Sequence, residues 1–222
     1  MAASRALRVA ALGAACLALA CATGRAHVSP ALEAALKCRD SLAVADALEA
    51  LIAEGKDSPT DREVAYDAVT RAEEDTAAYA FARATVTGRL VQQRGLLGAG
   101  LIGDIESWAL RSRELDPAFR DGAATRLLGT LWVLAPAPFL RHGDSERGLA
   151  LLASLVRDHP GQLENHLRLA EAYIALNDPV PAAPQLCLCL AGKATLRHDE
   201  QRLLDALVAV AGTPDCAASL ER

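Results

Sequence analysis

Apolar residues recur at helical spacing along almost the whole chain after its first thirty residues. Leu42, Ala45, Leu48 and Ile52, for example, share one face of a helix but would lie on both faces of a strand. Of the 222 residues, 48 are Ala and 36 are Leu, whereas Val and Ile, which strands favour, together number 16. The sequence therefore predicts an all-α fold with no strand.

Breaks in this periodicity divide the chain into separate helices. Pro59 followed by Asp61 and Glu63 is a helix-start signal, and the glycine-rich residues 95–103 predict a flexible joint between two helices. We expect two short helices before residue 55, one long helix or two over 61–91, and helices over 104–115, 120–134, 145–158, 163–176, 179–191 and 199–211. Residues 215–222 are expected to form a frayed tail.

The first twenty residues have the features of a secretory signal peptide. Arg5 and Arg8 precede an apolar stretch over 9–20. Ala18-Leu19-Ala20-Cys21 is similar to the motif at which bacterial lipoproteins are cleaved and acylated on cysteine, although Leu is more usual than Ala at its first position. We expect residues 1–20 to be removed, Cys21 to carry lipid, 21–30 to be a tether and 31–214 to be one helical domain. Cleavage without lipid is the alternative.

Composition excludes several classes of protein. The net charge is −5 and the basic residues are scattered, which argues against nucleic acid as a partner, because phosphate binding needs a concentrated basic face. No apolar run reaches the ~18–20 residues of a spanning helix, which excludes an integral membrane protein, and we expect the protein to contact the membrane through the lipid anchor. A hydrophobic fraction of 52% excludes a wholly disordered chain.

The cysteine content is compatible with export. After cleavage of the signal peptide and acylation of Cys21, four cysteines remain: Cys38, Cys187, Cys189 and Cys216. They allow three disulfide pairings in an oxidising compartment, and buried thiols are an equally open alternative. Cys187 and Cys189 have no second Cys or His pair at zinc spacing, so we expect no metal.

Residues 120–192 contain the clearest internal repeat. His166, Leu169-Ala170 and Tyr173 match the first helix of a tetratricopeptide repeat, and the window before it has an insertion within 135–144. The repeat predicts antiparallel helical hairpins that stack into a tetratricopeptide-like superhelix. Small residues should let the paired helices approach closely while leucines fill the space around them. The small residues are Gly129, Ala170 and Ala182; the leucines are Leu128, Leu152, Leu169 and Leu186.

Residues 76–192 resemble the T component of TRAP transporters, a family of periplasmic lipoproteins built from tetratricopeptide-like helix pairs. The most specific feature is the insertion, which contains Ala135-Pro136, Pro138 and Gly143-Asp144. The other matching residues are Leu115-Asp116-Pro117, Leu128-Gly129, Trp132, Pro160, Leu169-Ala170-Glu171 and Asn177-Asp178. The resemblance implies a periplasmic accessory, without catalysis, that docks the soluble solute-binding component and can form homo-oligomers. Residues 31–75 show no such match.

No motif predicts catalysis. The residues 98–103 fit G-x-G-x-x-G, but a dinucleotide site needs a preceding strand, and the residues before Gly98 have a helical pattern. His198-Asp199-Glu200 is interpreted as a polar helix start, and His142 with Asp144 as part of a solvated loop. We therefore expect no enzymatic activity and no cofactor.

Repeat geometry predicts an inner groove that binds a partner. The residues expected to face it are Arg126, Thr130 and Val133, followed by Leu167, Glu171 and Ile174 in the next repeat. In the insertion, Phe139 is expected to form a second contact unless it packs into the core. The sequence thus predicts a TRAP-type accessory on the periplasmic side of a bacterial membrane, most simply the outer one. The alternative is a general tetratricopeptide scaffold lipoprotein for envelope assembly.

Overall fold

The computed structural model describes residues 27–217, which form ten α-helices, three short 3-10 helices and no strand. The predicted all-α fold is confirmed for this part of the chain. No helix in it is both long enough and apolar enough to cross a bilayer. The predicted signal peptide and the predicted lipid site at Cys21 lie outside the described residues.

The helices follow one another with short connections. The first part of the chain forms α1 (Pro30–Cys38), α2 (Ser41–Ala53), α3 (Pro59–Arg71), α4 (Ala77–Arg94) and the 3-10 helix η1 (Gly95–Leu101). The second part forms α5 (Ile102–Leu115), α6 (Ala123–Leu134), η2 (Ala137–Phe139), α7 (Ser145–Asp158), α8 (Leu163–Ala175), α9 (Pro179–Ala191), η3 (Lys193–Thr195) and α10 (His198–Ala211).

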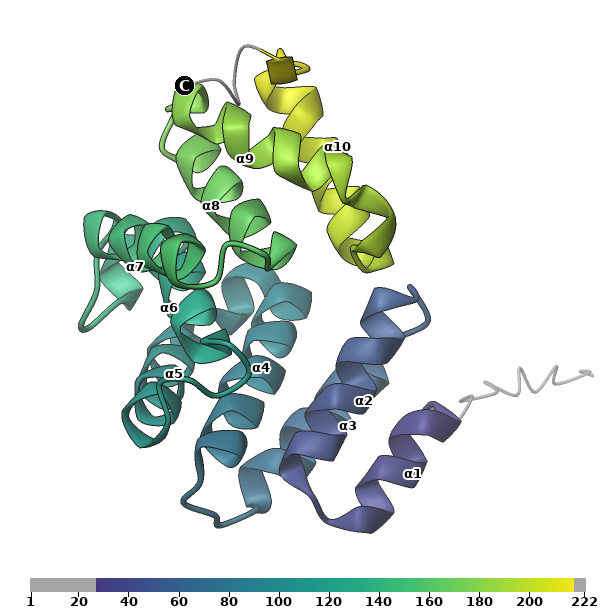
Figure 1. Cartoon of the computed structure of the whole chain (residues 1–222). Helices are drawn as coiled ribbons and strands as arrows, with labels where there is room; N and C mark the ends of the chain where they lie inside the picture. The colour runs from purple at the N-terminus through teal and green to yellow at the C-terminus, as the bar shows by residue number, and fades with distance from the viewer. Residues whose placement is uncertain (1–26, 218–222) are drawn as a thin grey trace, which may run out of the picture.

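Consecutive helices pack as antiparallel hairpins, most extensively α4 with α5, α6 with α7, and α8 with α9. Figure 1 shows these hairpins stacked in a curved array, in which α10 at one end comes beside α2 from the other. The even-numbered helices α2, α4, α6, α8 and α10 all contribute side chains to one central cavity. The hairpin prediction is confirmed, and we call these five even-numbered helices the inner helices.

Small residues bring the paired helices together as predicted. A Cβ atom on Gly129 would lie 2.7 Å from Leu152 Cγ, and one on Gly148 would lie 2.7 Å from the Gly129 carbonyl oxygen. The backbones of α6 and α7 are therefore too close for any side chain at these positions. Ala170 and Ala182 are completely buried between α8 and its neighbours. The predicted core leucines are also buried: Leu128, Leu152, Leu169 and Leu186.

Local signals explain where α3 begins and how it holds α1. Pro59 occupies its first turn, and Ser58 and Asp61 form a reciprocal capping box. The Asp61 carboxylate also accepts hydrogen bonds from the Ser29 backbone N–H (2.7 Å) and the Ser29 hydroxyl (2.8 Å). One buried carboxylate therefore joins the start of α1 to the start of α3.

Of the two alternatives for residues 61–91, one long helix or two, the structure shows two, α3 and α4. Other details differ from the prediction: the expected flexible joint over 95–103 is an ordered 3-10 turn that continues directly into α5. The helix expected from residue 120 begins at Ala123, because Arg120, Asp121 and Gly122 all have positive φ angles. The expected tail is attached at Cys216, which forms a disulfide with Cys187 of α9.

Candidate binding cavity

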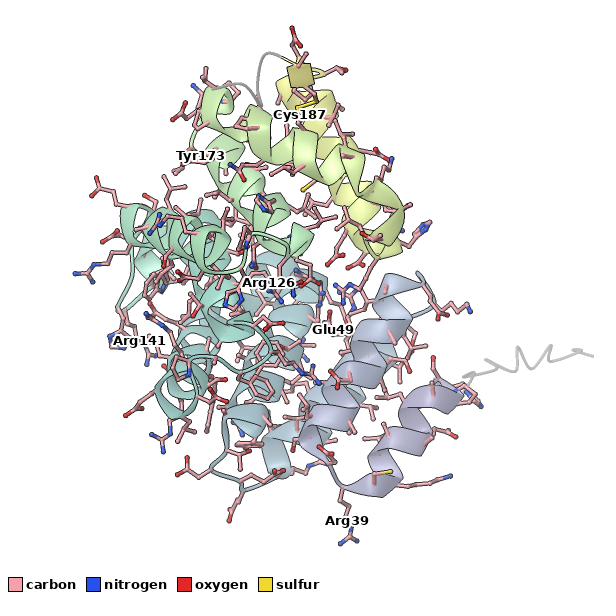
Figure 2. All side chains as sticks on the ribbon, in the orientation of Figure 1. Arg39, Glu49, Arg126, Arg141, Tyr173 and Cys187 are labelled. Carbon is pink, nitrogen blue, oxygen red and sulfur yellow. A yellow bond between two sulfur atoms is a disulfide. The ribbon has the colours of Figure 1, made fainter. Side chains whose placement is uncertain are left out.

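A cavity of about 820 Å³ lies at the centre of the array. Its wall is built by helix periodicity: α8, for example, contributes Glu164, Arg168 and Glu171, which are spaced by four and three residues. One part of the lining is apolar and contains Phe81, Ala84, Val91, Ile102, Ile105, Leu127, Leu131 and Leu134. Figure 2 shows Glu49 and Arg126, which lie on the polar part, directed toward this central space from different helices.

The polar part of the wall carries charges of both signs. The basic residues are Arg89, Arg120, Arg126, Arg168 and Arg197, and the acidic residues are Asp46, Glu49, Asp121, Glu164, Glu171 and Glu200. Because every one of these arginines forms an ion pair, the cavity offers paired charges rather than a basic surface. The hydroxyl groups of Thr85 and Thr130, also on the wall, lack hydrogen-bond partners among the described residues.

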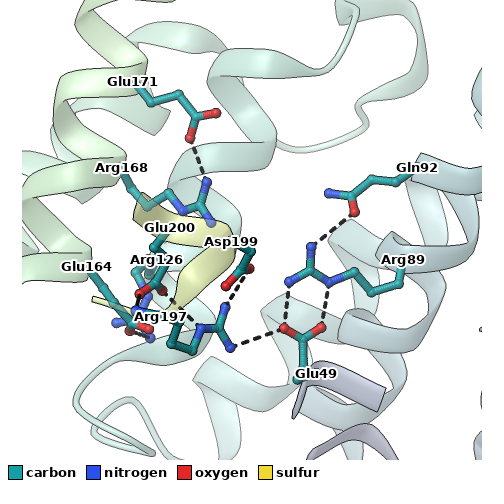
Figure 3. A network of polar contacts seen from close by, with 10 residues as sticks. All are labelled: Glu49, Arg89, Gln92, Arg126, Glu164, Arg168, Glu171, Arg197, Asp199 and Glu200. Atoms are coloured by element: carbon teal, nitrogen blue, oxygen red, sulfur yellow. Dashed lines mark hydrogen bonds and ion pairs between the residues drawn. The ribbon is translucent and has the colours of Figure 1, made fainter. Parts of the chain in front are cut away.

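Two carboxyl groups meet beside the arginines (Figure 3). Glu164 at the start of α8 and Glu200 at the start of α10 share a hydrogen bond. Arg126 of α6 forms an ion pair with Glu164, with 2.8 Å between the nitrogen and the oxygen, and donates a hydrogen bond of 3.0 Å to the side-chain oxygen of Asn165. Arg197 lies 3.3 Å from Glu200. This group joins three inner helices through buried polar contacts.

The two carboxyl groups differ in acidity because their surroundings differ. Burial and the hydrogen bond with Glu164 raise the pKa of Glu200 to about 7. Burial also opposes ionisation of Glu164, but its hydrogen bond with Glu200 and the charge of Arg126 outweigh that effect, and the net shift of its pKa is downward. Near neutral pH the pair therefore holds one proton on Glu200 for part of the time.

Glu49 of α2 connects the two ends of the array. Its carboxylate accepts two hydrogen bonds from Arg89 of α4, at 2.5 Å each, and lies 3.5 Å from Arg197 at the start of α10. Nearby, Arg120 and Asp46 of α2 form two hydrogen bonds of 2.6 Å. Helix α2, which carries no recognised repeat motif, thus completes the polar side of the cavity.

The structure places three of the six predicted groove residues on the cavity wall: Arg126, Thr130 and Glu171. The other three do not line it. Leu167 is completely buried in the core between α8, α9 and α10, and Ile174 packs against the same core. Val133 packs against α7 and α8 in another cluster. These apolar residues lie on the helix faces that pack against neighbouring helices, and the predicted positions of these three side chains are therefore wrong.

The insertion over 135–144 is held in place by a residue that sequence reasoning missed. Glu106 of α5 is completely buried, and its carboxylate accepts hydrogen bonds from the backbone N–H groups of Arg141 (2.7 Å), His142 (3.0 Å) and Gly143 (3.0 Å). The Trp132 indole N–H donates a fourth at 2.8 Å. Burial opposes ionisation, but these four donors outweigh it and lower the pKa of Glu106. In the sequence, Glu106 is one acidic residue among others in a predicted helix, and nothing in the pattern indicates that it binds the insertion.

Phe139 lies at the tip of the insertion with 38% of its surface exposed. The neighbouring Leu140 packs against the core formed by α4, α5 and α6 instead. The segment expected to be a solvated loop is therefore partly fixed, since the backbone N–H of His142 contacts Glu106 and Asp144 caps α7. The Phe139 side chain is thus partly exposed and is not a member of the buried core.

The structure also places the predicted polar helix start at Glu200 and the cysteines. Glu200 does begin α10, as predicted, but it also faces the cavity, which the sequence did not indicate. Cys187 pairs with Cys216, whereas Cys38 is exposed and Cys189 is buried as a thiol. Within residues 27–217 no group of three or more potential metal-binding side chains is found.

Comparisons with known proteins add no assignment: neither the family models nor the curated proteins include a match to this chain.

Proposed function

We propose that this chain is a non-enzymatic, lipid-anchored accessory of a TRAP-type solute transporter, which docks the soluble solute-binding component in the periplasm. The observation that carries the proposal is the cavity lined by the inner helices of successive hairpins. Stacked helix pairs form a continuous inner surface, and this is the surface that helical-repeat proteins use for binding.

Two further features support it. The residues of the insertion that carry the family resemblance have connected roles, since Gly143 packs directly on the Trp132 ring and both contact Glu106. A loop held in this way presents Phe139 in a fixed position beside the array. The disulfide between Cys187 and Cys216 is compatible with an oxidising compartment such as the periplasm.

The test is co-purification from membranes of the native host with a tagged full-length chain. We expect a solute-binding protein among the recovered partners. Replacing Leu134 by Arg should weaken that complex at least tenfold, because Leu134 lines the cavity and is 45% exposed. Leu115→Arg is the matched control, since Leu115 is 38% exposed at the end of α5 and does not line the cavity.

Circular dichroism should show that both variants fold. Recovery of other envelope proteins without a solute-binding protein would favour the general scaffold instead. Equal binding by Leu134→Arg and Leu115→Arg would exclude the cavity as the docking site. Mass spectrometry of the mature chain tests the anchor separately: we expect acyl chains on Cys21 and none after Cys21→Ser.

A further inference from the structure

Two adjacent leucines stand out on the surface. Leu96 and Leu97 in η1 are 92% and 93% exposed, more than any other large hydrophobic residue in the described part of the chain. Glycines surround them: a Cβ atom on Gly95 or Gly100 would have no neighbouring atom within 4 Å. The two leucine side chains therefore project from a turn that has little other bulk, and water contacts nearly all of their apolar surface.

Contacts through α3 place the turn near the point where the N-terminal segment joins the core. Val28 packs against the first core cluster, and Ser29 is bonded to Asp61 at the start of α3. Two residues further along α3, Glu63 lies 3.7 Å from Arg94, the last residue of α4 before η1. The start of α1, the start of α3 and the end of α4 are thus neighbours.

The adjoining turn of α3 strengthens this arrangement. Arg62, between Asp61 and Glu63, donates a hydrogen bond of 3.2 Å to the backbone oxygen of Arg89 in α4. Two independent contacts therefore join the first turn of α3 to the last turns of α4. These contacts fix the position of the η1 turn, and with it Leu96 and Leu97, relative to the point where the N-terminal segment joins the core.

The length of that segment limits how far an anchor at Cys21 can lie from the turn. Seven residue steps separate Cys21 from Val28, and an extended chain covers at most about 24 Å over seven steps. A lipid on Cys21 would therefore hold the bilayer surface near the end of the molecule that carries the two leucines. Short apolar protrusions gain free energy by entering the interface of a membrane to which a protein is already held.

We propose that Leu96 and Leu97 form a second membrane contact, entering the lipid surface on which the Cys21 anchor holds the protein. This inference rests on the proposed lipid anchor. It gives the protein two attachment points, the acyl chains and the η1 turn, and so fixes how the array is oriented on the membrane. With the acyl chains as the only attachment point, nothing would fix the orientation of the array above the surface.

The experiment uses the full mature, acylated chain in vesicles of phosphatidylethanolamine and phosphatidylglycerol with brominated acyl chains. Leu97→Trp places an indole in the turn, and bromine quenches indole fluorescence only at close range. The matched control is Val210→Trp, because Val210 is 76% exposed. It lies near the end of α10, which Figure 1 shows running away from α2.

We expect the added fluorescence of Leu97→Trp to fall by about half in brominated vesicles, and that of Val210→Trp to stay unchanged. In a Cys21→Ser background, Leu96→Ser with Leu97→Ser should lower vesicle binding about tenfold or more relative to Cys21→Ser alone.

Unquenched Leu97→Trp fluorescence in a chain whose mass shows the acyl groups would overturn the membrane contact and leave the anchor intact. A blue shift that grows with protein concentration without vesicles would assign the turn to a second copy of the chain instead. A mass without acyl groups would overturn the anchor, and the tethered contact with it.

Discussion

Glu200 has a role in the folded protein that its position in the sequence does not indicate. In the sequence it follows His198 and Asp199 and has the character of a polar helix start, and its carboxylate does accept a hydrogen bond from the Arg197 backbone N–H at 3.0 Å. In the folded protein it is only 4% exposed and shares a hydrogen bond with Glu164, which begins a different helix. Ionisation of both carboxyl groups at once is unfavourable, because the two negative charges would repel each other.

This proximity predicts a loss of stability as the pH rises through neutrality. The pKa of Glu200 is about 7 in the folded protein, against an ordinary value of 4.5. Because the folded state binds this proton more tightly, the contribution of Glu200 to the free energy of unfolding is complete below about pH 4.5 and is lost as the pH passes 7. In denaturant titrations, Glu200 should make the free energy of unfolding lower at pH 8 than at pH 5, by an amount on the order of 2 kcal/mol.

Glu200→Gln should remove most of that difference, because a neutral amide cannot ionise. Glu171→Gln is the control: Glu171 lines the same cavity and pairs with Arg168 at 2.8 Å, and the variant should keep the pH dependence of the natural protein. Asp61, Glu106 and Glu164 have lowered pKa values and affect stability only at lower pH. There, protonation of their carboxylates destabilises the fold. Equal pH dependence in Glu200→Gln and the natural chain would contradict the assignment.

At the scale of elements, the insertion between α6 and α7 depends on a neighbouring helix. A Cβ atom on Gly143 would lie 2.0 Å from the Trp132 ring, so the loop lies directly on that side chain. The buried carboxylate of Glu106 in α5 then satisfies three consecutive backbone N–H groups of the loop and the Trp132 indole. Without such an acceptor these donors would be buried without partners.

Glu106→Ala should therefore lower the free energy of unfolding by about 3 kcal/mol or more, since four donors lose their acceptor at once. Chemical denaturation followed by Trp fluorescence measures this loss, and a change in the folded-state emission of Trp132 should accompany it. Glu114→Ala is the control, because Glu114 is 70% exposed in its ion pair with Arg111. The free energy of unfolding of that variant should stay within about 0.5 kcal/mol of the value for the natural chain. Similar losses in both variants would show that Glu106 has no special role.

At the scale of the whole molecule, contacts between distant parts of the sequence close the array. Glu49 and Arg197 are 148 residues apart and approach to 3.5 Å across the cavity. Asp46 reaches Arg120 in the connection before α6. At the C-terminal end, the disulfide between Cys187 and Cys216 attaches the segment after α10 to α9. The curved stack is thus fastened both across its cavity and at its last hairpin.

Cys216→Ser should lower the free energy of unfolding by about 3 kcal/mol, because the disulfide spans 29 residues and restricts the unfolded chain. Thermal denaturation of the oxidised protein measures this, with Cys38→Ser, at an exposed thiol, as the control that should change little. Alkylation at pH 8 should label Cys38 but spare Cys189, since burial raises the pKa of the Cys189 thiol to about 12. Alkylation of Cys216 in the folded chain would contradict the pairing.

Helix periodicity and small residues such as Gly129 act locally, and the all-α class, most of the helices and the close approach of α6 and α7 could therefore be predicted from the amino-acid sequence. It also placed Arg126, Thr130 and Glu171 on the inner surface. Three features could be found only in the folded protein: Leu167 belongs to the core, Glu106 holds the insertion, and Glu200 meets Glu164. They depend on which helices, distant in the sequence, come together, and the spacing of residues within one helix carries no information about that.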